Sequence, residues 1–189
     1  LEIRCLHSSE KFGGGKVVKV QQFKIDTDRQ AAVEWAADMN RQGFNIYYGV
    51  NPRKPDTPQF GAGSNEDVEI AFYNFADIDS QETVDLVKAW DGSKYTWAVT
   101  TGTEPNTRAH IYWELEHPNR NMKAWTDVQS GIADTFKSDR VIDPARIMRL
   151  AGTVNYPDAK KVARGYRVEV TKIKTEYDDD REAVGNVQM

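Results

Sequence analysis

Two aspartates, Asp77 and Asp79, stand two residues apart at the end of the most apolar run of the chain, residues 68–76. Side chains alternate along a strand, so both carboxylates share one face while Ile78 points the other way, into the core. Like charges this close repel each other, and a cation between them would relieve the repulsion. Oxygen ligands favour a hard ion such as Mg²⁺ or Mn²⁺. The alternative is structural: the strand ends here, and Asp77 or Ser80 caps the next helix.

A second group of charged residues begins at Asp143. Pro144 suits the first turn of a helix, and Asp143 suits its N-cap, so a purely structural role for this acid is one interpretation. On the short helix expected here, Arg146 and Arg149 are three residues apart and share a face. Two guanidinium groups near a metal-binding carboxylate would suit a triphosphate.

A histidine lies on the second strand of a predicted hairpin, whose strands span 95–101 and 109–115. Apolar residues alternate along that second strand and form its inner face. His110 therefore falls on the opposite face with Tyr112 and Glu114, and we expect it outside the core. An ordinary solvent-facing histidine is the alternative interpretation.

These three signals occur in a characteristic order: Asp77-x-Asp79, then His110, then Ile142-Asp143 leading into Arg146-x-x-Arg149-x-x-Gly152-Thr-Val-Asn155. The order resembles the archaeo-eukaryotic primase superfamily, particularly the primase-polymerases of phages and plasmids. Members carry D-x-D/E, then small-x-His, then hydrophobic-Asp. Phage members often continue in a form close to D-P-A-R-x-x-R-x-x-G-T-x-N. The match spans about residues 44–170, and its last segment is the most specific part.

The resemblance implies a role for each of these residues. The catalytic residues, which would also hold two divalent ions (Mg²⁺ or Mn²⁺), would be Asp77, Asp79 and Asp143. His110 would contact the phosphates of the incoming nucleotide. Further nucleotide-binding candidates are Arg146, Arg149, Asn155 and Arg108. Arg108 departs from the pattern, because the family has a small residue there. Basic residues that could hold the template strand are Arg53, Lys160, Lys161 and Arg164.

The implied activity is that of a DNA primase or DNA polymerase, a DNA-directed nucleotidyltransferase of phage or plasmid replication. Two metal ions would assist the joining of nucleoside triphosphates (NTPs or dNTPs) on a single-stranded or primed DNA template. Phage relatives also carry helical and helicase regions after this module. Alternatives are a rolling-circle-type replication endonuclease and a non-catalytic single-stranded nucleic-acid-binding module. The endonuclease needs two histidines close together on a strand, and only His110 is suitably placed. A sugar-nucleotide transferase also uses D-x-D but gives no use to the 143–149 segment.

The order of elements predicts an α+β fold built on largely antiparallel sheets. The resemblance adds an RRM-like sheet and an N-terminal α/β unit. We expect a primase-polymerase catalytic domain over 1–175 and an acidic linker or tail over 176–189. Residues 1–16 show little pattern, and Gly13–Gly15 is read as a flexible loop. Predicted strands are 17–25, 44–50, 68–79, 95–101, 109–115 and 166–174. Predicted helices begin near Thr27, at Ser80 and at Pro144, and one spans 122–136.

Composition narrows the class of protein. The 189 residues are 39% hydrophobic, enough for a core. The net charge of -4 is unevenly spread: residues 176–182 hold five acids and one arginine, whereas residues 140–167 hold seven Lys or Arg and two Asp. That basic band could hold a polyanion, or could simply be a solvated surface. One cysteine, Cys5, and the lack of a signal peptide or membrane span favour a cytoplasmic protein without membrane partners, by the resemblance in a phage- or plasmid-carrying bacterial or archaeal host.

Overall fold

The computed structural model describes residues 1–7 and 17–175. The predicted glycine loop and acidic tail lie outside these described residues. Within them, none of the helices combines the length and apolar character needed to cross a bilayer.

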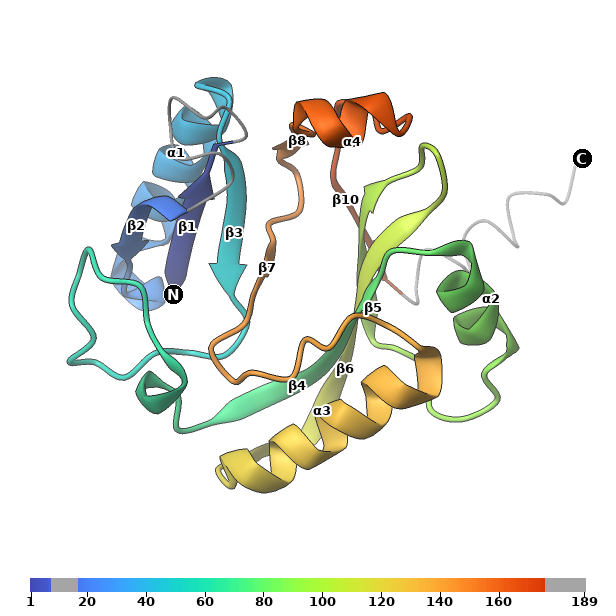
Figure 1. Cartoon of the computed structure of the whole chain (residues 1–189). Helices are drawn as coiled ribbons and strands as arrows, with labels where there is room; N and C mark the ends of the chain where they lie inside the picture. The colour runs from blue at the N-terminus through green and yellow to red at the C-terminus, as the bar shows by residue number, and fades with distance from the viewer. Residues whose placement is uncertain (8–16, 176–189) are drawn as a thin grey trace, which may run out of the picture.

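The first sheet is antiparallel, with the strand order β2-β1-β3-β7. Its strands are β1 (Glu2–Leu6), β2 (Val17–Gln22), β3 (Asn45–Gly49) and β7 (Ile147–Arg149). Helix α1 (Ile25–Arg41) covers this sheet on the side away from the rest of the molecule (Figure 1). Ala32, Ala36 and Met39 recur at helical spacing on α1 and are buried against Ile3 and Ile46 of the sheet. The apolar stripe of α1 thus holds the helix on its strands.

The second sheet is also antiparallel, with the strand order β10-β5-β6-β4. Its strands are β4 (Ala71–Ile78), β5 (Trp97–Gly102), β6 (Arg108–Asn119) and β10 (Lys172–Thr175). Helix α3 (Met122–Phe136) runs along β4, and α2 (Gln81–Ala89) packs against α3. Shorter elements are η2 (Asn65–Asp67), β8 (Val154–Asn155), α4 (Ala159–Ala163) and β9 (Glu169–Val170). The predicted α+β class with antiparallel sheets is therefore confirmed.

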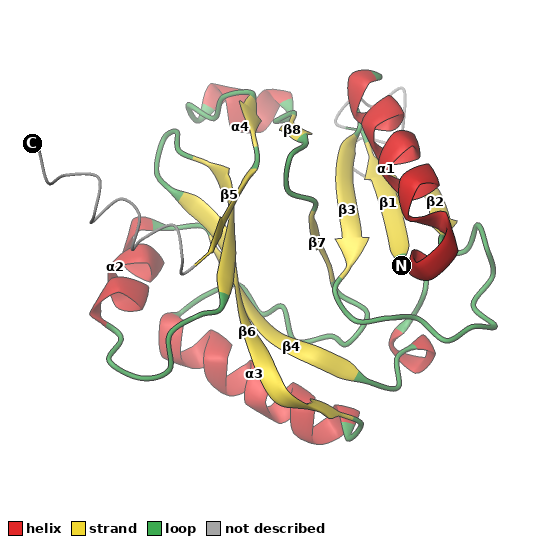
Figure 2. Ribbon diagram, turned by 180° about the vertical axis from the view of Figure 1, so that it is seen from behind, coloured by secondary structure: helices red, strands yellow, loops and turns green. Residues whose placement is uncertain are grey.

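The chain returns from the second sheet to the first through β7. This strand pairs antiparallel with β3, with Tyr48 opposite Met148. Figures 1 and 2 show β7 and the following β8 between the two sheets, with α4 at one end. A strand from late in the sequence thus completes the first sheet on the side that faces the second sheet.

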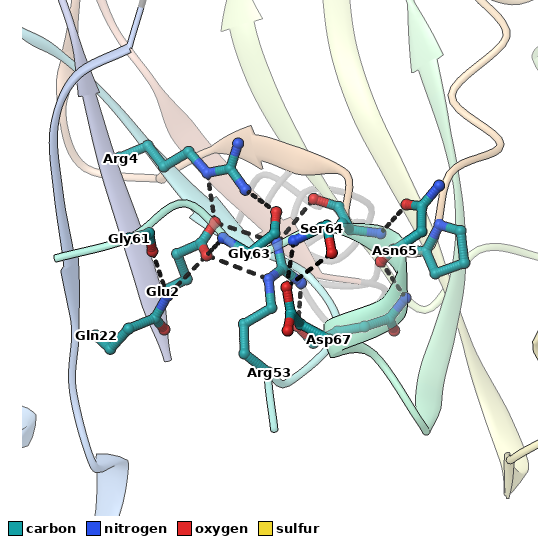
Figure 3. Close-up of polar contacts among 12 residues, drawn as sticks. Glu2, Arg4, Gln22, Arg53, Gly61, Gly63, Ser64, Asn65 and Asp67 are labelled. Atoms are coloured by element: carbon teal, nitrogen blue, oxygen red, sulfur yellow. Dashed lines mark hydrogen bonds and ion pairs between the residues drawn. The ribbon is translucent and has the colours of Figure 1, made fainter. Parts of the chain in front are cut away.

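Buried Glu2 ties β1 to the long loop between β3 and β4 (Figure 3). Its carboxylate accepts hydrogen bonds from Gly63 N–H at 2.7 Å and from Gln22 Nε2 at 2.8 Å, and it pairs with Arg4 and Arg53. The Arg53 guanidinium also donates to Ala145 O at 2.7 Å, and the side chain is 2% exposed. The expectation that Arg53 reaches the template is therefore wrong, because its charge is enclosed and already paired.

Local predictions hold where packing agrees with the pattern. The helix over 122–136 and the Ser80 cap are confirmed, with Thr83 N–H donating to Ser80 Oγ at 3.2 Å. Helix α1 begins at Ile25, before the predicted Thr27 cap, and Asp28 accepts from Lys24 N–H at 3.0 Å. Strand β1 lies in the stretch that shows little pattern. These differences lie at the ends of elements or at a strand whose partners come from elsewhere in the chain.

The predicted helix after Pro144 is wrong. Arg146 N–H donates to Asp143 O at 3.0 Å in a single turn, and the chain then extends as β7. Pairing with β3 supplies backbone hydrogen bonds that a short isolated helix would lack, so tertiary context overrides the local pattern. Arg146 and Arg149 consequently do not share a helical face.

Candidate active site

A cavity of about 180 Å³ lies where the two sheets meet, with walls from β3 to β8 and from α4. The sequence-predicted residues that line it are Asp77, Asp79, Arg108, His110, Arg149, Asn155 and Lys161. Asp139, Tyr47 and Tyr166 also line it and were not predicted. The structure therefore brings together acidic and basic side chains from segments as far apart as Asp77 and Lys161.

Three carboxylates share one side of this cavity: Asp77 at the end of β4, Asp79 just beyond it, and Asp139 after α3. Withdrawal from water raises the pKa of Asp77 to about 6, and the negative charge of Asp139 adds to the shift. Burial, with the charge of Asp77 next, also raises the pKa of Asp79. The acid pair predicted to converge at the strand end does so, and a third acid joins it.

The third acid is Asp139 and not Asp143. Asp143 does not line the cavity; its Oδ1 accepts a hydrogen bond from Arg146 Nη2 at 2.7 Å. After α3 the chain passes the end of β4 at Asp139 and then runs back along that strand, with Val141 held beside Phe75. Asp143 lies further along this path, outside the cavity wall. The structure therefore places neither Asp143 nor Arg146 in the wall, although the charge of Arg146 still acts on Asp77.

Sequence reasoning missed Asp139 because the hydrophobic-Asp step points to residue 143. The available signal was the end of α3. The helix ends after Phe136 with Lys137 in a left-handed conformation, which turns the chain sharply. An acid that directly follows such a turn could lie beside the end of the strand on which the helix packs. Only the direction taken by the chain after the turn distinguishes Asp139 from Asp143.

His110 is buried at 6% exposure, contrary to the expectation that it lies outside the core. Strand β7 covers the face of β6 that the alternation predicted to be polar and open. The backbone N–H of Arg149 donates to His110 Nδ1 at 3.3 Å, and His110 Nε2 lies 3.6 Å from Asp77 Oδ1. Burial, followed by the nearby Arg149 charge, lowers the pKa of His110 to about 3. The imidazole is therefore neutral at physiological pH, and because Nδ1 accepts, its proton resides on Nε2.

Arg149 places a buried positive charge opposite the acids. It donates to Asn45 Oδ1 at 2.8 Å and to the Tyr47 hydroxyl at 2.6 Å, and it lies over the Tyr47 ring. Burial lowers the pKa of this guanidinium, but an arginine remains charged. Asn155, on β8, donates to Thr101 O at 2.7 Å. Partners on β3 and β5 therefore hold both predicted side chains at the cavity wall.

Arg108 occupies the position where the resembling family has a small residue. Its side chain is 3% exposed, with Nε 3.8 Å from Asp79 Oδ1 and Nη2 3.7 Å from Glu169 Oε1. The guanidinium carbon lies 4.1 Å from the centre of the Tyr166 ring. In the described part of the chain, Arg108 Nη2 is buried without a hydrogen-bond acceptor. The departure from the pattern therefore adds a positive charge with one unused donor beside the acids.

Helix α4 forms a basic rim next to Tyr166. Lys161 lines the cavity, Lys160 is exposed on the same helix, and Arg164 is exposed directly after the helix ends. Arg164 and Lys161 also approach the Tyr166 ring, at 5.2 and 5.8 Å from its centre. These three predicted template residues are thus available to solvent or to the cavity, unlike Arg53.

The acidic side of the cavity suits a hard divalent cation chemically. Oxygen-only donors are the ligands such ions prefer, and the pKa values of Asp77 and Asp79 are raised even though arginine and lysine charges act on both acids. Across residues 1–7 and 17–175, no three His, Cys, Asp or Glu side chains converge closely enough to enclose an ion by themselves. Water or a bound substrate would therefore have to complete the coordination.

Comparison with known proteins identifies the architecture. No family model and no curated protein sequence matches the chain. A solved structure does match: the cyanophage S-2L primase-polymerase (PrimPol), AEP domain, with a TM-score of 0.64 over 92% of this chain and 80% of that one, at 22% identity. The chain has the AEP primase-polymerase fold. The resemblance expected from the order of the motifs is confirmed at the level of this fold.

Proposed function

We propose that this chain is a DNA-directed nucleotidyltransferase of the primase-polymerase type. The observation that carries the proposal is the cavity of the AEP fold, where Asp77, Asp79 and Asp139 face the buried charge of Arg149. A carboxylate side for divalent ions and a basic side for phosphates are the two parts that nucleotidyl transfer requires.

Asp77, Asp79 and Asp139 would hold Mg²⁺ or Mn²⁺. Such ions, when bound, activate the attacking 3′-oxygen and stabilise the leaving pyrophosphate. Asp77, whose pKa is about 6, would contribute negative charge above that pH. The separation of these acids in the sequence makes the site dependent on the whole fold.

His110 and Arg149 would orient the triphosphate. Neutral His110 presents Nε2–H near Asp77 and is a hydrogen-bond donor without net charge. Arg149 supplies the positive charge, and its side-chain bonds to β3 hold it in place before any ligand arrives. Arg108 would add a second cation with a free donor. Groups that are already oriented stabilise developing charge without reorganisation during the reaction.

The basic rim of α4 would hold the template strand. Lys160, Lys161 and Arg164 offer charge to the phosphate backbone, and the Tyr166 ring offers a face on which a base could stack. Binding through these residues would weaken strongly with rising salt, because it releases counterions from the DNA.

The direct test is primer extension on a primed DNA template with dNTPs or NTPs and Mn²⁺ or Mg²⁺. The wild-type chain should incorporate nucleotides, and Asp77→Ala/Asp79→Ala should not. Asp143→Asn is a matched control that removes an acid outside the cavity. A second template without a primer tests initiation. Full extension by the double variant would remove the role proposed for these acids, and template binding without incorporation under every metal condition would favour the single-strand-binding alternative.

A further inference from the structure

Gln129 is a fully buried polar side chain on α3, with 1% exposure. Its Oε1 accepts a hydrogen bond from Phe75 N–H at 3.0 Å, and its Nε2 donates to Phe75 O at 3.1 Å. The same Nε2 also donates to Val141 O at 3.0 Å. One amide thus satisfies backbone groups of two segments that are 66 residues apart in the sequence.

The amide acts where β4 has no neighbouring strand. β4 is an edge of its sheet, and a buried edge must find partners for its exposed N–H and C=O groups. At Phe75, Gln129 makes the donor and acceptor bonds that a neighbouring strand would otherwise provide. Its bond to Val141 then fixes the segment after α3 beside the same point of β4.

This bridge lies two residues from an acid on each side. Asp77 follows Phe75 by two positions on β4, and Asp139 precedes Val141 by two positions. Val141 N–H donates to Asp139 O at 2.8 Å, so the backbone between the bridge and Asp139 is held in a tight turn. Val141 itself is buried in the same cluster as Phe75.

The other contacts of the 137–141 segment lie nearer its start. Ser138 N–H donates to Ala133 O at 3.0 Å, and the buried Thr83 donates from Oγ1 to Lys137 O at 3.4 Å. Arg140 pairs with Asp134 at 2.9 Å with both side chains more than half exposed, and exposed ion pairs of this kind contribute little. Gln129 therefore holds the end of the segment that follows Asp139.

We infer that Gln129 is a positioning residue that sets the spacing between Asp77 and Asp139 and thereby the affinity of the cavity for a divalent cation. The inference rests on the proposed function, which assigns these acids to a metal site. Removing a residue that orients metal ligands without touching the metal commonly weakens metal affinity by roughly 10- to 100-fold.

The test compares Gln129→Met and Gln129→Asn with the wild-type full chain. Free Mn²⁺ is counted by electron paramagnetic resonance in a titration without nucleotide. We expect roughly tenfold weaker Mn²⁺ binding in both variants. In primer extension the Mn²⁺ concentration at half-maximal rate should rise by the same factor, with partial recovery of rate at high Mn²⁺.

Trp125→Phe is the matched control. Trp125 lies one turn earlier on α3 and belongs to the same buried cluster as Val141, but its indole donates to Tyr73 O at 3.0 Å and so ties the helix to β4 instead of to the 137–141 backbone. It should lower thermal stability and leave Mn²⁺ affinity within about twofold of wild type. If Gln129→Met does not fold, Gln129→Asn decides.

Unchanged Mn²⁺ affinity in a folded Gln129 variant would overturn the inference, as would absence of Mn²⁺ binding by the wild type or an equal loss in Trp125→Phe. Gln129-dependent Mn²⁺ binding in a wild-type chain that incorporates no nucleotide would uphold the inference and refute the proposed function. The two claims therefore fail separately.

Discussion

Glu2 lies at the start of β1 and Asp77 near the end of β4, and the protein shifts the pKa values of these two carboxylates in opposite directions. Burial alone would raise the pKa of Glu2, but Arg53, Arg4 and the Gly63 N–H hold it below its usual value. Burial, with the charge of Asp139 next, raises the pKa of Asp77 to about 6, although Arg149, Lys161 and Arg146 act against the shift. Glu2 is therefore easier to ionise than an ordinary glutamate, and Asp77 is harder to ionise than an ordinary aspartate.

The difference separates a structural acid from a functional one. Both oxygens of the Glu2 carboxylate are engaged, by hydrogen bonds from Gly63 and Gln22 and by ion pairs with Arg4 and Arg53 (Figure 3). Asp77 lies beside two further acids, and its contact with the neutral His110 is 3.6 Å long, beyond hydrogen-bonding distance. Uncompensated charge lowers stability and leaves binding capacity for a cation.

The largest effect should come from Asp77→Asn. We expect nucleotide incorporation to fall by roughly 10³-fold, because a group that stabilises charge in the transition state is removed. Stability of the cation-free protein should instead rise, by about 1–3 kcal/mol at pH 8, because the folded state no longer ionises a group whose pKa is raised. Primer extension and urea unfolding measure the two effects.

The stability difference between Asp77→Asn and the wild type should depend on pH. The folded pKa of Asp77 is raised from 3.8 to about 6, so the folded state binds more protons in this interval and loses stability as pH rises through it. The advantage of Asp77→Asn should vanish below about pH 4 and be complete above about pH 7. A variant less stable than wild type at pH 8 would contradict the contrast with Glu2.

Glu2→Gln should destabilise the fold by about 3 kcal/mol, because it leaves the Arg53 charge, 2% exposed, without its partner. The folded pKa of Glu2 is lowered, so its contribution is present above the ordinary value of 4.5 and is lost as pH falls below it. Urea unfolding at pH 7 and at pH 4 measures this dependence. Activity per folded molecule should stay unchanged, and a loss of Mn²⁺ binding would show that the two regions are coupled.

A divalent cation should raise the free energy of unfolding by binding at the Asp77 site and not at Glu2. Mn²⁺ at 100 times its dissociation constant should stabilise the wild type by about 2.7 kcal/mol. The gain should persist in Glu2→Gln and be largely absent in Asp77→Asn. Thermal unfolding with Mn²⁺ and with EDTA checks this, and equal gains in all three proteins would place the ion elsewhere.

The smallest effect should come from Asp143→Asn. Asp143 pairs with Arg146, and both side chains are about one-third exposed. The substitution should therefore lower the free energy of unfolding by less than about 1 kcal/mol and leave primer extension within a few-fold of wild type. Asp139→Asn should behave like Asp77→Asn in primer extension. The reverse result, with Asp143 essential and Asp139 dispensable, would restore the assignment made from the motif alone.

Local patterns in the sequence determined much of this molecule. Alternation placed Asp77 and Asp79 on one face, and helical spacing gave α3 its bounds at Met122 and Phe136. The order of the acidic and histidine motifs indicated the fold that the structure match confirms. Each of these signals depends on neighbours within a few positions, where backbone geometry fixes which residues share a face.

Tertiary structure decided what no local pattern could. The pairing of β7 with β3 turned an expected helix into a strand and buried His110, and the Glu2 network enclosed Arg53. The path of the chain after α3, held by Gln129, brought Asp139 rather than Asp143 to the acids of β4. The physical reason is that burial and pairing depend on which distant segments meet, and their contacts outweigh preferences of a fraction of a kcal/mol per residue.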